Sequence, residues 1–277
     1  MSAPSNILLI LGNQLFPRSH LDGIAADTVY MAEDYGLCTH FSYHKHKLIL
    51  FLAAMRHYRD ELRQKGLKVH YEQLTPDKTQ LSYWDKLKSY LDGRKAKSFL
   101  LHTFEVEDHF FAKELEEFCQ REGHELVIHQ SPMFLVTRER FKEYLDSSKR
   151  PFMKTFYEQI RRETGIMMKP SGEPEGGKYS YDGDNRNKLP KDIEIPPLPT
   201  VSQQPEVVGQ VQKLVADLFA DHPGDADNFW LPVTRRVYLN WLKSFIKDRF
   251  EWFGTYQDAI TNNSDFVFHS VLSPGIN

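Results

Sequence analysis

The chain has 277 residues, of which 40% are hydrophobic, and it carries 35 Lys and Arg against 38 Asp and Glu, a formal net charge of -3. This composition is typical of a globular protein with one or two domains, and it excludes an overall basic nucleic-acid-binding surface. Cys38 and Cys119 are too few for a disulfide framework or for an iron–sulfur cluster built by this chain alone. No run of 18 apolar residues and no amino-terminal leader pattern occurs, so we expect no membrane partner and a cytoplasmic location.

Residues 1–135 alternate between short aliphatic segments and helical patterns. The segments with the length and composition of strands are 6–11, 28–33, 67–73, 97–102 and 124–129. Apolar residues recur at helical spacing in 44–65, 81–91 and 108–122, and a glycine follows each of these patterns. Strands that alternate with helices predict a doubly wound α/β domain with a parallel five-stranded sheet.

The rest of the chain predicts helices separated by a long loop. Residues 137–164 are helical and basic, and 165–205 are dense in Pro, Gly, Asp and Lys, which is typical of a functional loop or a linker. Amphipathic patterns follow at 205–222 and 234–253, with no strand left to pair. We therefore expect an α/β domain over 1–135, a basic helix and linker over 136–204, and the helices of a second domain over 205–277.

The first strand is followed by the sequence Leu11-Gly12-Asn13-Gln14-Leu15. Ligands of open α/β sheets bind outside the carboxyl ends of the strands, where a glycine lets a ligand approach the backbone. The segment is neither a dinucleotide fingerprint nor a Walker loop. The alternative is a simple strand-to-loop turn, and the pattern alone favours neither interpretation.

A histidine-rich segment, 35–47, leads into the first long helix. His40, His44 and His46 suggest a metal site, but His44 and His46 are two residues apart and point in different directions on a helix. No carboxylate or thiol completes a set with recognised spacing. The segment therefore favours a solvated basic helix start over a metal site.

Cations cluster between residues 138 and 191, where 13 Lys and Arg occur with 9 Asp and Glu. The candidates for DNA binding are Lys149, Arg150, Lys154, Arg161 and Arg162. Tyr157 lies among them and could contact bases or sugars. The alternative, which the pattern favours slightly, is a solvated amphipathic helix that packs Phe152, Phe156 and Ile160 inward.

Two further motifs stand out. The long loop contains PEGGKYSYDGDNR, from Pro174 to Arg186, in which Gly176 and Gly177 indicate a special backbone geometry. The carboxyl-terminal residues 268–277 read FHSVLSPGIN, where Ser270 and Ser273 taken alone are helix-cap residues. For the polar residues of the loop, hydrogen bonds within their own domain are at least as well supported as DNA contact.

Together with LILGNQL near the start, these two motifs resemble the deoxyribodipyrimidine photolyase-related family of iron–sulfur bacterial photolyases and cryptochromes. Relatives commonly have tryptophan where Tyr179 stands. The resemblance implies a Rossmann-like domain, a linker and the first helices of an all-α FAD-binding domain. It also implies flavin- and light-dependent repair of pyrimidine dimers or (6-4) photoproducts in damaged DNA.

The resemblance further implies cofactor sites. For an antenna such as 6,7-dimethyl-8-ribityllumazine it implies Gly12, Asn13, Gln14, Leu37 and His40. Asn13, Leu37 and His40 depart from the usual residues, so we expect this site to be empty or to hold a different chromophore. For the flavin phosphates it implies Tyr256, His269, Ser270, Leu272, Ser273 and Asn277, with no catalytic residue in this chain.

The resemblance covers roughly the first half of a full-length relative, so we expect this chain to lack the far wall of the flavin pocket and to be incompetent in repair alone. The alternative is a non-enzymatic light-sensing or nucleotide-binding module. The rings of Trp241, Phe245, Trp252 and Phe253 lie in the last helices. We expect these rings to pack against the α/β domain, to mediate self-association or to be partly disordered.

Overall fold

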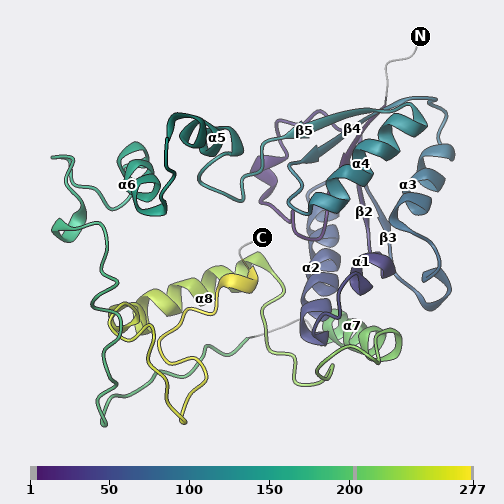
Figure 1. The fold of residues 1–277 in the computed structure, drawn as a ribbon. Coiled ribbons are helices and arrows are strands. Elements are labelled where there is room, and N and C mark those ends of the chain that lie inside the picture. Colours follow the sequence, from purple (N-terminus) through teal and green to yellow (C-terminus); the bar gives the residue numbers. More distant parts are fainter. Residues whose placement is uncertain (1–4, 202–204, 276–277) are drawn as a thin grey trace. The chain divides into compact units, whose positions relative to one another are not determined.

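The computed structural model describes residues 5–201 and 205–275 (Figure 1). Two compact units emerge, so far as their residues are described. The α/β unit takes Met1–Pro132, Thr200–Tyr238 and Gly275–Asn277, and the helix–loop unit takes Met133–Pro199 and Leu239–Pro274. These units are defined by packing and do not test the domain boundaries expected from the sequence, which stay a prediction.

The α/β unit is built on a five-stranded parallel sheet. Its strands are β1 (Ser5–Leu9), β2 (Thr28–Ala32), β3 (Val69–Glu72), β4 (Phe99–Phe104) and β5 (Glu125–His129). Their order is β3-β2-β1-β4-β5, and every neighbouring pair is parallel. The doubly wound fold predicted from alternating periods is thus confirmed. In this order the chain reverses direction across the sheet between β1 and β4, which is where such folds open a ligand crevice.

Helices cover both faces of the sheet (Figure 1). On one face α3 (Tyr83–Asp92) and α4 (His109–Glu122) bury Leu87 and Leu115 against Ile7 and Leu9. A capping box between Ser82 and Asp85 starts α3. Gly123, at φ 72°, ends α4 in the left-handed conformation that glycine adopts most readily.

The other face is covered by α2 (Lys45–Gln64), which is preceded by a short helix, α1 (Tyr35–Thr39), that the sequence did not predict. Helix α7 (Pro205–Leu218) packs on α2, where Val211 and Val215 share a buried cluster with Leu48 and Leu52. The first of the predicted late helices therefore contributes to the core of the α/β unit.

The helix–loop unit contains α5 (Arg138–Ser147), α6 (Met153–Thr164), the larger part of α8 (Arg235–Asp248) and α9 (Phe250–Phe253). The predicted helix over 137–164 is in fact broken between α5 and α6. Pro151 explains the break, because proline donates no backbone hydrogen bond and disfavours a helical residue before it. The pattern over 234–253 is likewise interrupted at Arg249, which has φ −131°.

Short 3-10 turns complete the described structure at Arg18–His20, Pro76–Lys78, Glu175–Gly177 and Ser273–Gly275. The side chains of Trp241 and Phe245 are buried within the helix–loop unit, and the Trp241 indole donates to the carbonyl oxygen of Ser270 at 2.9 Å. Trp252 stays exposed. None of the described helices combines the length and apolarity needed to cross a bilayer.

Candidate functional site

The crevice between β1 and β4 is closed by a side chain of the chain itself. The Gln14 side-chain amide is buried and donates to the carbonyl oxygens of Phe104 and Glu105, at 3.3 and 3.1 Å. Gln14 thereby ties the loop after β1 to the end of β4. Its hydrogen-bonding capacity serves the fold at the position where the sequence predicted a ligand.

The other residues predicted for an antenna also contact the chain. A Cβ placed on Gly12 would lie 3.1 Å from Met55 Sδ and 3.2 Å from Phe51, so this glycine permits close approach of α2. Leu37 packs on the core below α3 and α4, and its backbone N–H donates to Asp34 Oδ1 at 2.9 Å. The ring of His40 stacks on Phe110, with centroids 4.1 Å apart. The structure leaves Asn13 half-buried.

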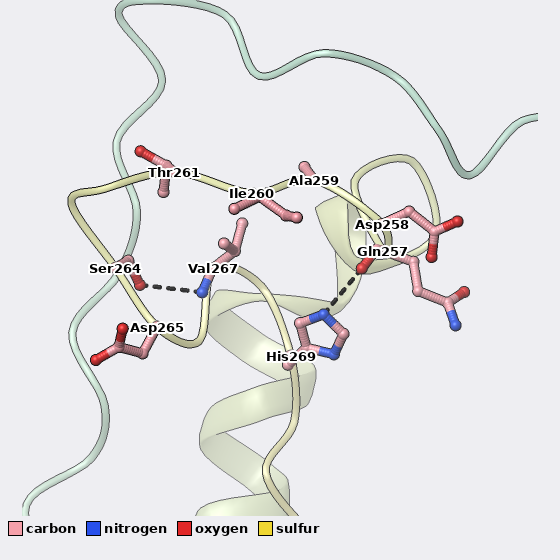
Figure 2. A pocket seen from close by; sticks show the side chains of 9 residues that line it. All are labelled: Gln257, Asp258, Ala259, Ile260, Thr261, Ser264, Asp265, Val267 and His269. Atoms are coloured by element: carbon pink, nitrogen blue, oxygen red, sulfur yellow. Dashed lines mark hydrogen bonds between the residues drawn. The ribbon is translucent and has the colours of Figure 1, made fainter.

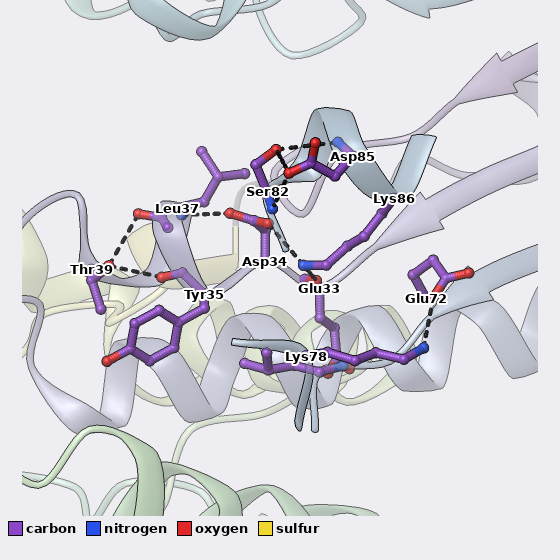
Figure 3. A network of polar contacts seen from close by, with 12 residues as sticks. Glu33, Asp34, Tyr35, Leu37, Thr39, Glu72, Lys78, Ser82, Asp85 and Lys86 are labelled. Atoms are coloured by element: carbon purple, nitrogen blue, oxygen red, sulfur yellow. Dashed lines mark hydrogen bonds and ion pairs between the residues drawn. The ribbon is translucent and has the colours of Figure 1, made fainter. Parts of the chain in front are cut away.

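The carboxyl end of β2 carries a buried ionic network that sequence reasoning missed (Figure 3). Glu33 accepts two hydrogen bonds from the Arg56 guanidinium, at 2.7 and 3.0 Å, and further bonds from Tyr71 and the Leu74 backbone. Beside it, the buried Lys86 ammonium donates to Asp34 at 2.8 Å. Two acidic residues directly after a buried strand were the signal available in the sequence.

Every charge in this network has a partner of opposite charge, so no charged group in it is left to bind a ligand. Burial raises the pKa of the neighbouring Cys38 thiol to about 12, and the Asp34 and Glu33 carboxylates add to the shift. Burial also raises the pKa of the Tyr71 hydroxyl well above its usual range, reinforced by Glu33. A thiol and a phenol held neutral in this way are poor nucleophiles at neutral pH.

The histidines at the start of α2 also have partners. The His44 ring accepts from the His46 backbone N–H at 3.0 Å, and His46 Nε2 lies 2.9 Å from the Asp227 carbonyl oxygen. Among the described residues, no three His, Cys, Asp or Glu side chains gather closely enough to hold a metal ion. The two ring systems therefore connect α2 to the segment after α7.

A cavity of about 390 Å³ lies in the carboxyl-terminal part of the helix–loop unit (Figure 2). It is lined by Gln257, Asp258, Ala259, Ile260, Thr261, Ser264, Asp265, Val267 and His269. His269 Nε2 lies 2.9 Å from the Gln257 carbonyl oxygen, and Ser264 Oγ accepts from the Val267 N–H at 3.0 Å. These contacts hold Val267 at φ 43°, a left-handed conformation that costs a β-branched residue about 1–3 kcal/mol.

The residues predicted to hold flavin phosphates do not converge on this cavity. Of those described, His269 alone lines it. Tyr256 is buried between Trp252 and Phe268, and Ser270 Oγ accepts from the Leu272 N–H at 3.4 Å. Ser273 begins a single 3-10 turn, and Asn277 lies outside the described residues. The carboxylates of Asp258 and Asp265 in the lining repel phosphate, so this cavity is a poor phosphate site, and the assignment of the predicted residues to the flavin stays a prediction.

The PEGGKYSYDGDNR loop has the special backbone that its glycines predicted. Gly176 has φ 72°, and a Cβ built there would lie 1.7 Å from the Tyr181 hydroxyl oxygen. Tyr181 also lies under the Lys178 ammonium, which pairs with Asp184 at 2.7 Å. Only glycine at position 176 permits this tyrosine to fold back on the loop.

Tyr179 joins this loop to α6. Its hydroxyl accepts from Arg162 Nε at 2.8 Å, and the Arg161 and Arg162 guanidiniums lie 5.2 and 5.0 Å from its ring centroid. The buried Arg161 also donates to the carbonyl oxygens of Ile166 and Tyr179, at 3.2 and 3.3 Å, and to that of Met167. Arg161 is thereby fully engaged in holding the loop.

The end of the loop docks on residues 255–258. The Asn185 carbonyl oxygen accepts from the Asp258 N–H, and Arg186 pairs with the Asp258 carboxylate at 3.4 Å. The Asn187 N–H donates to the Thr255 carbonyl oxygen. For Asn185 and Arg186, these contacts agree with the alternative interpretation, in which hydrogen bonds tie the loop to its own unit.

The cations predicted for DNA binding divide into two groups. Lys149 and Arg150, between α5 and α6, are exposed, as are Lys154 and Arg162 on α6. Arg161, by contrast, is only 7% exposed. Phe156 packs inward on Phe141 and Tyr144, and Tyr157 points outward, both as the pattern indicated. Phe152, expected to be inward, is instead exposed because it lies before the first turn of α6.

The fold defines a Rossmann-like α/β protein whose second unit carries a glycine loop and a basic helical hairpin. The model of the deoxyribodipyrimidine photo-lyase-related protein family matches residues 8–231. The chain belongs to this family.

Two relatives place the chain further. It is 30% identical to a (6-4) photolyase of Agrobacterium fabrum in an alignment of 277 positions that covers 99% of this chain and 54% of the relative. It is 31% identical to an uncharacterised protein of Acanthamoeba polyphaga mimivirus in an alignment of 203 positions that covers 69% of this chain and 98% of that protein. The chain thus spans about half the length of the (6-4) photolyase and nearly the whole of the viral protein.

Proposed function

We propose that the chain is the DNA-binding portion of a light- and flavin-dependent photolyase system that acts on pyrimidine dimers or (6-4) photoproducts. The observation that carries this proposal is the identity with a (6-4) photolyase along 99% of the chain. Because 54% of that relative is covered, lesion, flavin and repair are proposed for the system to which the chain contributes.

Exposed cations support DNA binding by the helix–loop unit. Lys149, Arg150, Lys154 and Arg162 project from one helical hairpin and its connection, where they can contact phosphates. Phe152 occupies the cap position of α6 and has no polar side chain to satisfy the first-turn N–H groups. We leave Arg161 out of the proposed interface because its donors are engaged with backbone carbonyls.

A flavin, when bound, supplies the light-excited electron that such repair requires. The assignment of Tyr256, His269, Ser270, Leu272, Ser273 and Asn277 to its phosphates stays a prediction, and no step of this proposal rests on it. We assign to this chain the binding and orientation of the damaged strand.

A non-enzymatic module is the second candidate. The viral relative favours it, because that short protein is matched along 98% of its own length. A module of this kind would bind a nucleotide or sense light without completing a repair reaction.

Exposed apolar side chains also support self-association. Leu239 and Ile246 are exposed two turns apart on α8, and Phe250 is exposed at the start of α9. We expect the purified chain to form a dimer or larger species. Light scattering coupled to size exclusion measures this, and a monomer at every concentration contradicts it.

Damaged DNA provides the test of function. We expect the purified chain to bind an ultraviolet-irradiated duplex more tightly than the same unirradiated duplex, with an affinity that falls as salt rises. A Lys149→Ala/Arg150→Ala double variant should weaken binding to both duplexes. Damaged-DNA binding without repair is the expected result for the DNA-binding portion, whereas repair of the irradiated duplex under blue light, together with a flavin spectrum, would show that this chain alone completes the reaction. Absence of salt-sensitive binding to either duplex contradicts the proposed DNA-binding function and leaves the non-enzymatic module.

A further inference from the structure

Two exposed aromatic rings stand beside the cations of the α5–α6 hairpin. Phe152 is 63% exposed and Tyr157 is 48% exposed, and Lys149, Arg150 and Lys154 flank them in sequence. We propose that this surface binds single-stranded nucleic acid, with the two rings stacking on unpaired bases and the three cations contacting the backbone. The inference rests on the proposed DNA function and narrows it to unpaired strands.

Packing of the hairpin does not require these rings. Phe156 joins the two helices, with its ring centroid 5.2 Å from that of Phe141 and 4.7 Å from that of Tyr144. Phe152 and Tyr157 contribute aromatic area on the outside, next to Met153, which is 74% exposed. Several apolar side chains exposed close together and rimmed by polar groups are typical of a binding surface, whereas a single exposed one is not.

Contacts within the hairpin hold the backbone of Phe152 and one face of the Tyr157 ring. The Tyr144 hydroxyl donates to the Phe152 carbonyl oxygen and accepts from the Phe152 N–H, both at 2.9 Å, so the backbone that carries the Phe152 ring is fixed. The Arg161 guanidinium, itself immobilised, lies 5.7 Å from the Tyr157 ring centroid. A ring positioned beforehand loses little conformational entropy when a base stacks on it.

The charge around the rings matches a polyanion. Residues 147–157 contain three Lys or Arg and no Asp or Glu. The nearest carboxylate on α6, that of Glu158, pairs with Arg162 at 3.3 Å and lies 4.0 Å from the Lys154 ammonium. An apolar protein partner would match the rings but would leave Lys149 and Arg150 without a counter-charge in the part of the chain that the structure describes.

Unpaired strands fit better than duplex because of what a ring needs. Bases within a duplex cover one another's faces, whereas an unstacked base presents a free face to an aromatic side chain. Stacking on aromatic rings, combined with cations that follow the backbone, is the general mode of single-strand binding.

Fluorescence anisotropy with a labelled oligothymidylate, and with a duplex hairpin of equal length, tests the inference. We expect the full chain to bind the single strand more tightly. Phe152→Ala and Tyr157→Ala should each weaken single-strand binding about five- to one-hundredfold, whereas Tyr157→Phe should retain it. The matched control is Phe41→Ala, which removes a ring that is 61% exposed but lies in the α/β unit.

Salt titrations separate the two kinds of contact. Lys154→Ala should reduce the logarithmic salt slope on the single strand by about 0.7, whereas the ring variants should leave the slope unchanged. Circular dichroism melting checks that each variant is folded, and Tyr157→Leu, which keeps apolar area, should lose affinity as Tyr157→Ala does.

Contrary outcomes fall into distinct classes. Salt-sensitive binding that is equal for both probes and insensitive to the ring variants overturns this inference and leaves the proposed DNA function standing. Full affinity in Tyr157→Leu shows a merely apolar contact and overturns it too. Absence of salt-sensitive binding to either probe overturns the proposed function and this inference together.

Discussion

The carboxyl edge of the sheet and the α5–α6 hairpin are both rich in charged side chains, yet they use them in opposite ways. At the sheet edge, Glu33, Asp34 and Lys86 are buried and paired (Figure 3). On the hairpin, Lys149 and Lys154 are in solvent. Charged groups that hydrogen-bond to one another inside the protein stabilise a particular fold, whereas exposed ones remain available for a partner.

The comparison teaches where to look for function in a doubly wound domain. The crevice beyond β1 and β4 is the general ligand site of such sheets, but here Gln14 spans it with two hydrogen bonds to backbone carbonyls. The helix–loop unit, by contrast, presents exposed cations, among them Lys149 and Arg150.

The largest effect is expected at the buried network. Glu33→Ala leaves the Arg56 guanidinium buried without its carboxylate, and we expect it to lower the free energy of unfolding by about 3–5 kcal/mol. Urea denaturation followed by circular dichroism measures this. The control is Glu61→Ala, which breaks the exposed pair with Lys65 and should stay within the range of ordinary surface substitutions. Equal effects of the two changes would contradict the structural role given to the sheet edge.

Arg161 and Arg162 allow a buried, paired charge to be compared with an exposed one within a single turn of α6. Arg161→Ala removes the donors to three loop carbonyls and should destabilise the helix–loop unit by about 1–3 kcal/mol. Arg162→Ala should change stability little and instead weaken DNA binding in a salt-dependent way. Thermal melting and anisotropy are measured on both variants. The assignment of a structural role to Arg161 and a binding role to Arg162 is wrong if Arg161→Ala melts like the wild type, or if Arg162→Ala binds DNA like the wild type.

A smaller effect is expected in the glycine loop. Gly176→Ala places a methyl group where the Tyr181 hydroxyl lies and forces a left-handed alanine, so the loop should open and limited proteolysis near Tyr181 should speed up severalfold. Gly172→Ala is the matched control, because Gly172 has φ 83° but no atom within 4 Å of a built Cβ. If both variants are cleaved equally fast, the backbone angle matters and the tyrosine contact does not.

Local patterns predicted the sheet because each strand and helix signals itself in a few residues. Partners distant in sequence could not be predicted: Gln14 reaches carbonyls about ninety residues away, and the burial of Arg161 depends on how the loop after α6 folds back. The break at Pro151 was available in the sequence, since proline in the middle of a helical pattern usually ends it. Phe152, the exposed ring of the proposed surface, was misassigned to the core for the same reason.

The smallest effect concerns the pH dependence of stability and a pair of histidines on β4 and β5. His102 Nδ1 lies 2.9 Å from His129 Nε2, and burial lowers the pKa of both rings, with His129 adding to the shift of His102. Because the folded pKa values lie below the usual 6.5, the folded state disfavours the protonated rings. Their contribution to stability is complete above pH 6.5 and is lost as the pH falls from 6.5 towards the lower folded values.

We therefore expect the urea midpoint to fall between about pH 7 and pH 5, since titration of the unfolded histidines spans roughly that interval. His57 and His124, whose pKa values burial also lowers, contribute in the same direction. A His129→Gln variant should be less stable at pH 7 but should show a flatter pH profile, because the mutual repulsion of two protonated rings is removed. A pH profile as steep as that of the wild type would show that the His102–His129 pair does not cause the pH dependence of stability.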